Sequence, residues 1–118
     1  GQFYKPHCDG FDGPTCSCGF ENSNRLVTLF VYLNSVSRGG ETTFPLMNLS
    51  IKPEKGTAVI HFPADTDLNF DPRTIHESRD VEGEDDVKYL LVTWVWAHAL
   101  ADSRYNEEMI TRLTNDII

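Results

Sequence analysis

The sequence predicts an all-β fold of two packed sheets, a jelly roll or a sandwich, followed by one C-terminal helix. Short apolar segments recur with turn signals between them, as is typical of antiparallel sheets. A helical pattern occurs only at the C-terminal end, and many short strands with a single helix favour two packed sheets. The expected strands are 2–7, 25–33, 41–44, 57–62, 74–77 and 88–96.

The segment 25–33 is the clearest strand. It is rich in β-branched and aromatic residues and is apolar on both faces, so we expect it to be packed between two layers. Gly39-Gly40 predicts a tight turn into the strand 41–44, because glycine permits a positive φ. The turn residues of 52–56 lead into the strand 57–62.

The predicted helix occupies 101–118. Asp102 or Ser103 can cap its beginning, and apolar residues then recur every four positions on one face. We therefore expect this helix to lie against a sheet. The apolar residues are Tyr105, Met109, Leu113 and Ile117.

A length of 118 residues is enough for one domain with its own core and too short for a second domain of ordinary size. We predict a single domain, 1–118, with the strands and loops in 1–98. The net charge of -8 argues against attraction to nucleic acid or to an anionic membrane surface. No apolar run is long enough to predict direct membrane insertion.

Cysteine content leaves the compartment unknown. Cys8, Cys16 and Cys18 are too few and too crowded for a disulfide framework, so the redox environment stays open. Asn48-Leu49-Ser50 is a glycosylation sequon that fits the endoplasmic reticulum, but such tripeptides also arise by chance. The cytoplasm is the alternative.

Two histidines and one carboxylate form a candidate metal site. His7 and Asp9 are two residues apart, so on an extended chain both side chains project from the same face. With His76 from another strand they make the ligand set of non-haem iron(II) oxygenases. The alternative is that His7 and Asp9 are a solvated strand end and His76 a hydrogen-bonded loop residue.

A lysine follows at the beginning of the last predicted strand. Lys88 and Trp94 are six residues apart and therefore share a strand face. A lysine ammonium can bind the far end of a dicarboxylate whose other end chelates a metal. Thr28, Phe30 and Tyr32 alternate onto one face of the central strand, where the Tyr32 hydroxyl can donate to the same carboxylate. A surface lysine and three ordinary core residues are the alternative.

Together these residues carry a family resemblance. Their order and spacing from 1 to about 96 resemble the prolyl 4-hydroxylase-like iron(II)- and 2-oxoglutarate-dependent dioxygenases. The matching pieces are Tyr4-Lys-Pro, His7-Cys-Asp9, Arg25-Leu-Val-Thr28, Tyr32-Leu-Asn34, Gly39-Gly-Glu-Thr42, Phe44-Pro45, Lys55-Gly56, His76, Lys88 and Trp94.

The resemblance implies a double-stranded β-helix, which is a jelly-roll variant, with a metal site and a cofactor pocket. Iron(II) would be held by His7, Asp9 and His76, which are thereby the catalytic residues. The distal carboxylate of 2-oxoglutarate would pair with Lys88. The other residues that the resemblance assigns are Tyr32 and Thr28 in the 2-oxoglutarate pocket, Trp94 and Tyr4 as pocket walls, and Arg25 near the substrate entrance.

The sequence departs from the family pattern in two ways. The interval from His76 to Lys88 is about two residues longer than is usual, so Arg79 is a rival for the anchor. The extra length falls in the acidic turn 82–86, where an insertion costs little. The family also has elements before the first metal-binding strand, and we expect such N-terminal elements to be missing from this sequence.

The reaction that the resemblance implies is hydroxylation of a peptidyl proline, with O2 consumed, 2-oxoglutarate decarboxylated to succinate and ascorbate as reductant. The partner is then a peptide or protein substrate that contains proline. One alternative is hydroxylation of another side chain or of a free amino acid. Another is a cupin-like metal-binding module without turnover, since a fold does not fix its function.

Overall fold

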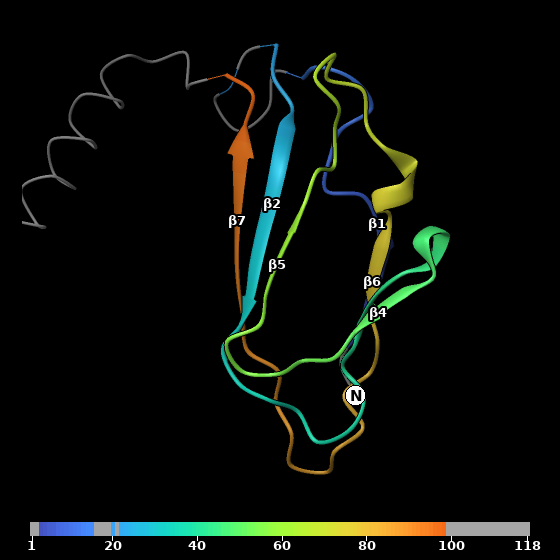
Figure 1. Ribbon diagram of the computed structural model, residues 1–118, viewed down its shortest axis with the longest axis vertical. Coiled ribbons are helices and arrows are strands. Elements are labelled where there is room, and N and C mark those ends of the chain that lie inside the picture. The colour runs from blue at the N-terminus through green and yellow to red at the C-terminus, as the bar shows by residue number, and fades with distance from the viewer. Residues whose placement is uncertain (1–2, 16–19, 21, 99–118) are drawn as a thin grey trace, which may run out of the picture.

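The computed structural model describes residues 3–15, 20 and 22–98, and over them the chain is all-β (Figure 1). The predicted helix 101–118 and the residues Cys16 and Cys18 lie outside the described residues. In chain order the elements are β1 (Tyr4–His7), β2 (Arg25–Tyr32), β3 (Thr42–Phe44), the 3-10 helix η1 (Pro45–Met47), β4 (Leu49–Ile51), β5 (Ala58–His61), the 3-10 helix η2 (Pro72–Thr74), β6 (His76–Ser78) and β7 (Leu90–Trp96).

The strands form two antiparallel sheets. One has the order β1-β6-β3-β4 and the other β5-β2-β7. In Figure 1 the two sheets stand as separate layers, with the strands of each running side by side. Strands distant in sequence are thus neighbours in space, and the prediction of an all-β fold with two packed sheets is confirmed.

Strand β2 has one buried face. Thr28, Phe30 and Tyr32 are buried and point between the sheets, whereas Leu29 and Val31 point to the other face and are half-buried. Three neighbours on that outer face, Ile60, Leu91 and Val95, are exposed. In the part of the chain that the structure describes, this outer face is flanked by strands of its own sheet, and the predicted helix 101–118, which was expected to lie against a sheet, is outside the described residues.

One strand was not predicted and another begins later than predicted, each for a local reason. Strand β4 was not predicted, since it is only three residues long and begins after Asn48, which adopts a left-handed conformation with φ of 51°. Strand β6 begins at His76 because Pro72–Thr74 form a 3-10 turn. The Asp71 side chain caps this turn by accepting a hydrogen bond from the Arg73 backbone N–H at 3.0 Å.

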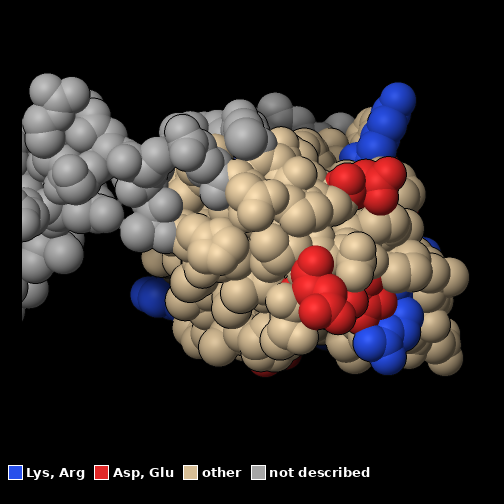
Figure 2. Space-filling view, turned by 90° about the horizontal axis from the view of Figure 1, so that it is seen from above, with Lys and Arg blue, Asp and Glu red and all other residues tan. Residues whose placement is uncertain are grey.

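Few charged side chains of this fold are buried. Figure 2 shows acidic groups with a basic side chain beside them on a largely uncharged face. The exposed pairs Arg38–Glu82 and Arg73–Asp71 have N–O distances of 3.0 and 2.6 Å. Such surface pairs contribute little stability. Among the described residues, no helix has the length and apolarity that crossing a membrane requires.

A fully buried asparagine fixes the chain that follows β1. The Asn24 amide donates to the carbonyls of Phe11, Gly13 and Leu68 at 2.9, 3.2 and 2.9 Å. Its side-chain oxygen accepts from the N–H of Phe11 at 2.9 Å. Asn24 therefore holds the loop just after Asp9 against the beginning of β2.

We expect Asn24→Ala to lower the free energy of unfolding by about 2–4 kcal/mol, because several buried backbone groups lose their partner. Urea unfolding followed by circular dichroism measures this. Ser35→Ala is the control, since the Ser35 hydroxyl is exposed and accepts only the Lys55 N–H in the described structure. Equal midpoint shifts for the two variants would contradict the structural role of Asn24.

Candidate metal and cofactor site

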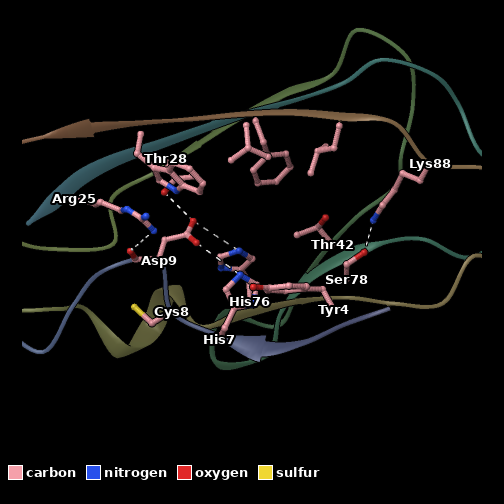
Figure 3. Close-up of a pocket in the computed structure, with 14 residues that line it drawn as sticks. Tyr4, His7, Cys8, Asp9, Arg25, Thr28, Thr42, His76, Ser78 and Lys88 are labelled. Carbon is pink, nitrogen blue, oxygen red and sulfur yellow. Dashed lines mark hydrogen bonds and ion pairs between the residues drawn. The ribbon is translucent and has the colours of Figure 1, made fainter. Parts of the chain in front are cut away.

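Strand pairing brings the three predicted metal ligands together. His7 ends β1 and His76 begins β6, and the antiparallel register places the two residues opposite each other. Their ring centroids are 4.3 Å apart. Asp9 follows two residues after His7, and one ligand atom from each of His7, Asp9 and His76 lies within 4.8 Å of the others (Figure 3).

Backbone carbonyls orient both imidazoles. Nδ1 of His7 lies 2.9 Å from the Lys5 carbonyl oxygen, and Nδ1 of His76 lies 2.9 Å from that of Thr74. A proton on Nδ1 donates to the carbonyl and leaves the Nε2 lone pair free to bind a metal. Both Nε2 atoms face Asp9, at 3.6 Å from Oδ1 for His7 and 3.9 Å from Oδ2 for His76.

The protonation states of these groups suit a cation. Burial alone would raise the pKa of Asp9, but the contacts with His61 and the Thr28 hydroxyl, together with the nearby histidine charges, hold that pKa well below its ordinary value. Asp9 is therefore ionised at neutral pH. Burial lowers the pKa of His76, which favours the neutral imidazole that a metal binds.

These residues fit a divalent metal ion. Two imidazoles and one carboxylate converge on the wall of a cavity of about 610 Å³. Because all three come from the β1–β6 side, the side of a bound ion that faces the cavity would stay open. This is the ligand set of non-haem iron(II) sites.

Lys88 lies at the other end of the same cavity, away from Asp9 (Figure 3). Its ammonium donates to the Gly40 carbonyl at 2.8 Å and to the Ser78 hydroxyl. Burial lowers the pKa of Lys88, with Glu41 opposing the effect. Thr42 and Ser78 also line the cavity, so one cation and two hydroxyls lie where the far carboxylate of a dicarboxylate would lie.

Arg79, the rival anchor, lies elsewhere. Its side chain is exposed, and its Nε is 3.9 Å from Glu77. Arg79 is not among the residues that line the cavity with Lys88. The geometry therefore favours Lys88 as the anchor.

Two residues predicted for the 2-oxoglutarate pocket have other contacts. The Thr28 hydroxyl donates to Asp9 Oδ2 at 2.8 Å, so Thr28 lines the cavity at its metal end. Tyr32 is fully buried, does not line the cavity, and donates its hydroxyl to Thr42 at 2.7 Å. Tyr32 therefore orients Thr42 from behind. Thr42 and Ser78 were not predicted as site residues, because only the register between β3 and β6 places them opposite each other.

Aromatic side chains and one arginine form the wall near Asp9. Tyr4, Arg25 and Trp94 all line the cavity. The Arg25 guanidinium lies 4.1 Å from the Trp94 ring centroid and donates to the Asp9 carbonyl at 3.2 Å. Its Nε is buried and has no hydrogen-bond partner in the described structure. Tyr4 packs edge-on against His7 with centroids 4.2 Å apart.

His61 is a further residue of the site that was not predicted from the sequence. This residue is buried at the end of β5, opposite Thr28 in the register, and its Nε2 lies 3.3 Å from Asp9 Oδ2. The available signal was the alternation of β5, which points His61 toward the buried face of the sheet. No short motif contains it.

In this fold of two β-sheets, two histidines and a carboxylate lie at one end of a cavity and a lysine lies at the other. The two histidines and the carboxylate are the ligand set of non-haem iron oxygenases. Residues 1–96 match the family model of the 2OG-Fe(II) oxygenase superfamily, and the chain belongs to this family. The resemblance predicted from the sequence is thereby confirmed.

Relatives within the family are prolyl hydroxylases. Prolyl 4-hydroxylase 1 of Arabidopsis thaliana is 37% identical over 94 residues, which cover 68% of this chain and 32% of the relative. Prolyl 4-hydroxylase subunit alpha-2 of Gallus gallus is 38% identical over 76 residues, which cover 64% of this chain and 14% of the relative. The chain thus spans about a third or less of the length of these relatives.

The fold is also that of a solved prolyl hydroxylase. The viral collagen prolyl hydroxylase of Paramecium Bursaria Chlorella virus-1, in its 2OG complex, superposes with a TM-score of 0.72 at 34% identity. The match covers 84% of this chain and 54% of the viral enzyme. The predicted all-β jelly-roll class is confirmed by this likeness.

Proposed function

We propose that the protein is an iron(II)- and 2-oxoglutarate-dependent dioxygenase that hydroxylates a proline within a peptide or protein. His7, Asp9 and His76 would hold the iron, and Lys88 would bind 2-oxoglutarate. The observation that carries this proposal is the presence of the ligand set and a half-buried lysine ammonium at two ends of one cavity. The prolyl hydroxylases among the relatives support the choice of substrate.

When bound, iron, 2-oxoglutarate and O2 supply the oxidative step that places one oxygen atom on a substrate carbon and releases succinate and carbon dioxide. The residues of this chain bind and orient the reactants. Lys88 fixes the far carboxylate of 2-oxoglutarate, with Thr42 and Ser78 beside it. Phe30, Leu90 and Val92 form an apolar cavity wall that limits the entry of water.

The substrate would enter on the side of Tyr4, Arg25 and Trp94. An aromatic wall suits the apolar ring of proline, and the Arg25 guanidinium lies beside it as a hydrogen-bond donor. We propose ascorbate as the reductant that keeps the iron ferrous, and 1–118 as part of a single catalytic domain. A passive metal-binding module would have no use for a half-buried ammonium beyond the metal end of the cavity.

The test is succinate formation by the full-length protein with iron(II), 2-oxoglutarate and ascorbate, with and without proline-rich peptides. We expect peptide-dependent succinate and a mass gain of one oxygen atom on a proline. Hydroxylation only of another side chain or of a free amino acid would assign a different substrate. A folded protein that yields no succinate under any of these conditions would contradict the enzyme proposal and leave a metal-binding module.

A further inference from the structure

His61 is a buried imidazole without a hydrogen bond. Its exposed fraction is 7%, and neither ring nitrogen has a hydrogen-bond partner in the described structure. The ring packs against Phe44, with centroids 5.4 Å apart, and against His76 at 4.9 Å. Because a buried polar group without a partner is destabilising, a core position with this packing favours an apolar ring. Packing alone therefore does not explain why this position holds a histidine.

The polar neighbour of His61 is the carboxylate of the candidate metal site. His61 Nε2 lies 3.3 Å from Asp9 Oδ2, the same oxygen that accepts the Thr28 hydroxyl at 2.8 Å. Thr28 and His61 are cross-strand partners on β2 and β5, so one sheet presents both groups to one oxygen. The other oxygen, Oδ1, faces His7 Nε2 at 3.6 Å.

We propose that His61 is a positioning residue for the metal site: together with Thr28 it holds Asp9 Oδ2 and so fixes the orientation of the carboxylate toward the cation. An ionised carboxylate only accepts hydrogen bonds, so His61 must be the donor, through a proton on its Nε2.

The inference rests on the proposed function, because it concerns the same metal site. His61 is not a ligand itself: the ligand atoms that gather within 4.8 Å are those of His7, Asp9 and His76.

Two substitutions separate positioning from packing. His61→Phe keeps a ring against Phe44 but has no donor, whereas His61→Gln keeps an N–H donor that reaches about as far as Nε2. The probe is Mn(II), whose binding is measured from the loss of the free-ion electron paramagnetic resonance signal. We expect His61→Phe to weaken Mn(II) binding about 10–100-fold, as is typical when a partner of a metal ligand is lost. His61→Gln should retain most of the affinity.

A double-mutant cycle with Thr28→Val adds a second readout. Because both groups hold one oxygen, we expect the losses of Mn(II) affinity to be non-additive. Thermal unfolding without metal serves as the folding control, and His61→Leu replaces His61→Phe in the comparison should the latter not fold.

Each outcome decides the inference. Unchanged Mn(II) affinity in His61→Phe would overturn it, and so would a His61→Gln variant that binds Mn(II) as weakly as His61→Phe, because ring packing would then be the cause. If the unsubstituted protein itself bound no Mn(II), the proposed function would fail together with the inference. Mn(II) binding that is normal in the unsubstituted protein and insensitive to His61 would overturn the inference alone.

Discussion

Replacing His7 by alanine is expected to reduce 2-oxoglutarate-dependent succinate formation to background while the fold is retained. The reason is that His7 supplies one of three ligand atoms, and the remaining pair, Asp9 and His76, would hold the metal weakly. The fold should persist because His7 is the last residue of β1 and its side chain is 29% exposed. Its loss therefore opens no internal cavity.

The measurement is succinate release at saturating iron(II) and 2-oxoglutarate, with circular dichroism and thermal unfolding as checks of the fold. His98→Ala is the matched control, since His98 is exposed and does not line the cavity. Its activity should equal that of the unsubstituted protein. Full activity in His7→Ala would remove the proposed ligand set, and with it the assignment of the metal site.

Much of the fold was predictable because strand alternation is a local property. The residues of β2 show their buried face in the sequence itself, since Thr28, Phe30 and Tyr32 recur every second position. Strand β4 was missed because a three-residue strand has too few positions to display alternation. Its pairing with β3 depends on a turn in which Asn48 adopts a left-handed conformation. Such a conformation is uncommon for a residue other than glycine, so the turn could not be predicted from the sequence.

The candidate site was predictable where one short motif carries it and less so where strand pairing creates it. His7 and Asp9 are two residues apart, so their proximity could be expected from the sequence, although β1 ends at His7 and Asp9 lies in the bend that follows. His61 was missed because its proximity to Asp9 depends on the register between β2 and β5. The position of the Tyr32 hydroxyl likewise depends on which strand faces β2, and it contacts Thr42 rather than the cavity.

Replacing Lys88 by alanine is expected to raise the concentration of 2-oxoglutarate needed for half-maximal rate by about 30-fold or more, with a smaller effect on the rate at saturation. Truncating one partner of a buried charge pair costs about 2–5 kcal/mol, which corresponds to this range. The loss falls on binding because Lys88 lies at the opposite end of the cavity from Asp9 and so acts on the carboxylate that does not react (Figure 3).

The measurement is the dependence of succinate release on 2-oxoglutarate concentration in Lys88→Ala and Arg79→Ala. Arg79 is the matched control, because it is the other cation between His76 and β7 and its side chain is exposed. Arg79→Ala should leave the 2-oxoglutarate requirement unchanged, since nothing in the cavity contacts it. Should the Arg79 variant alone raise that requirement, the longer acidic turn before β7 would have shifted the anchor, and 2-oxoglutarate would have to bind outside the cavity that Lys88 closes.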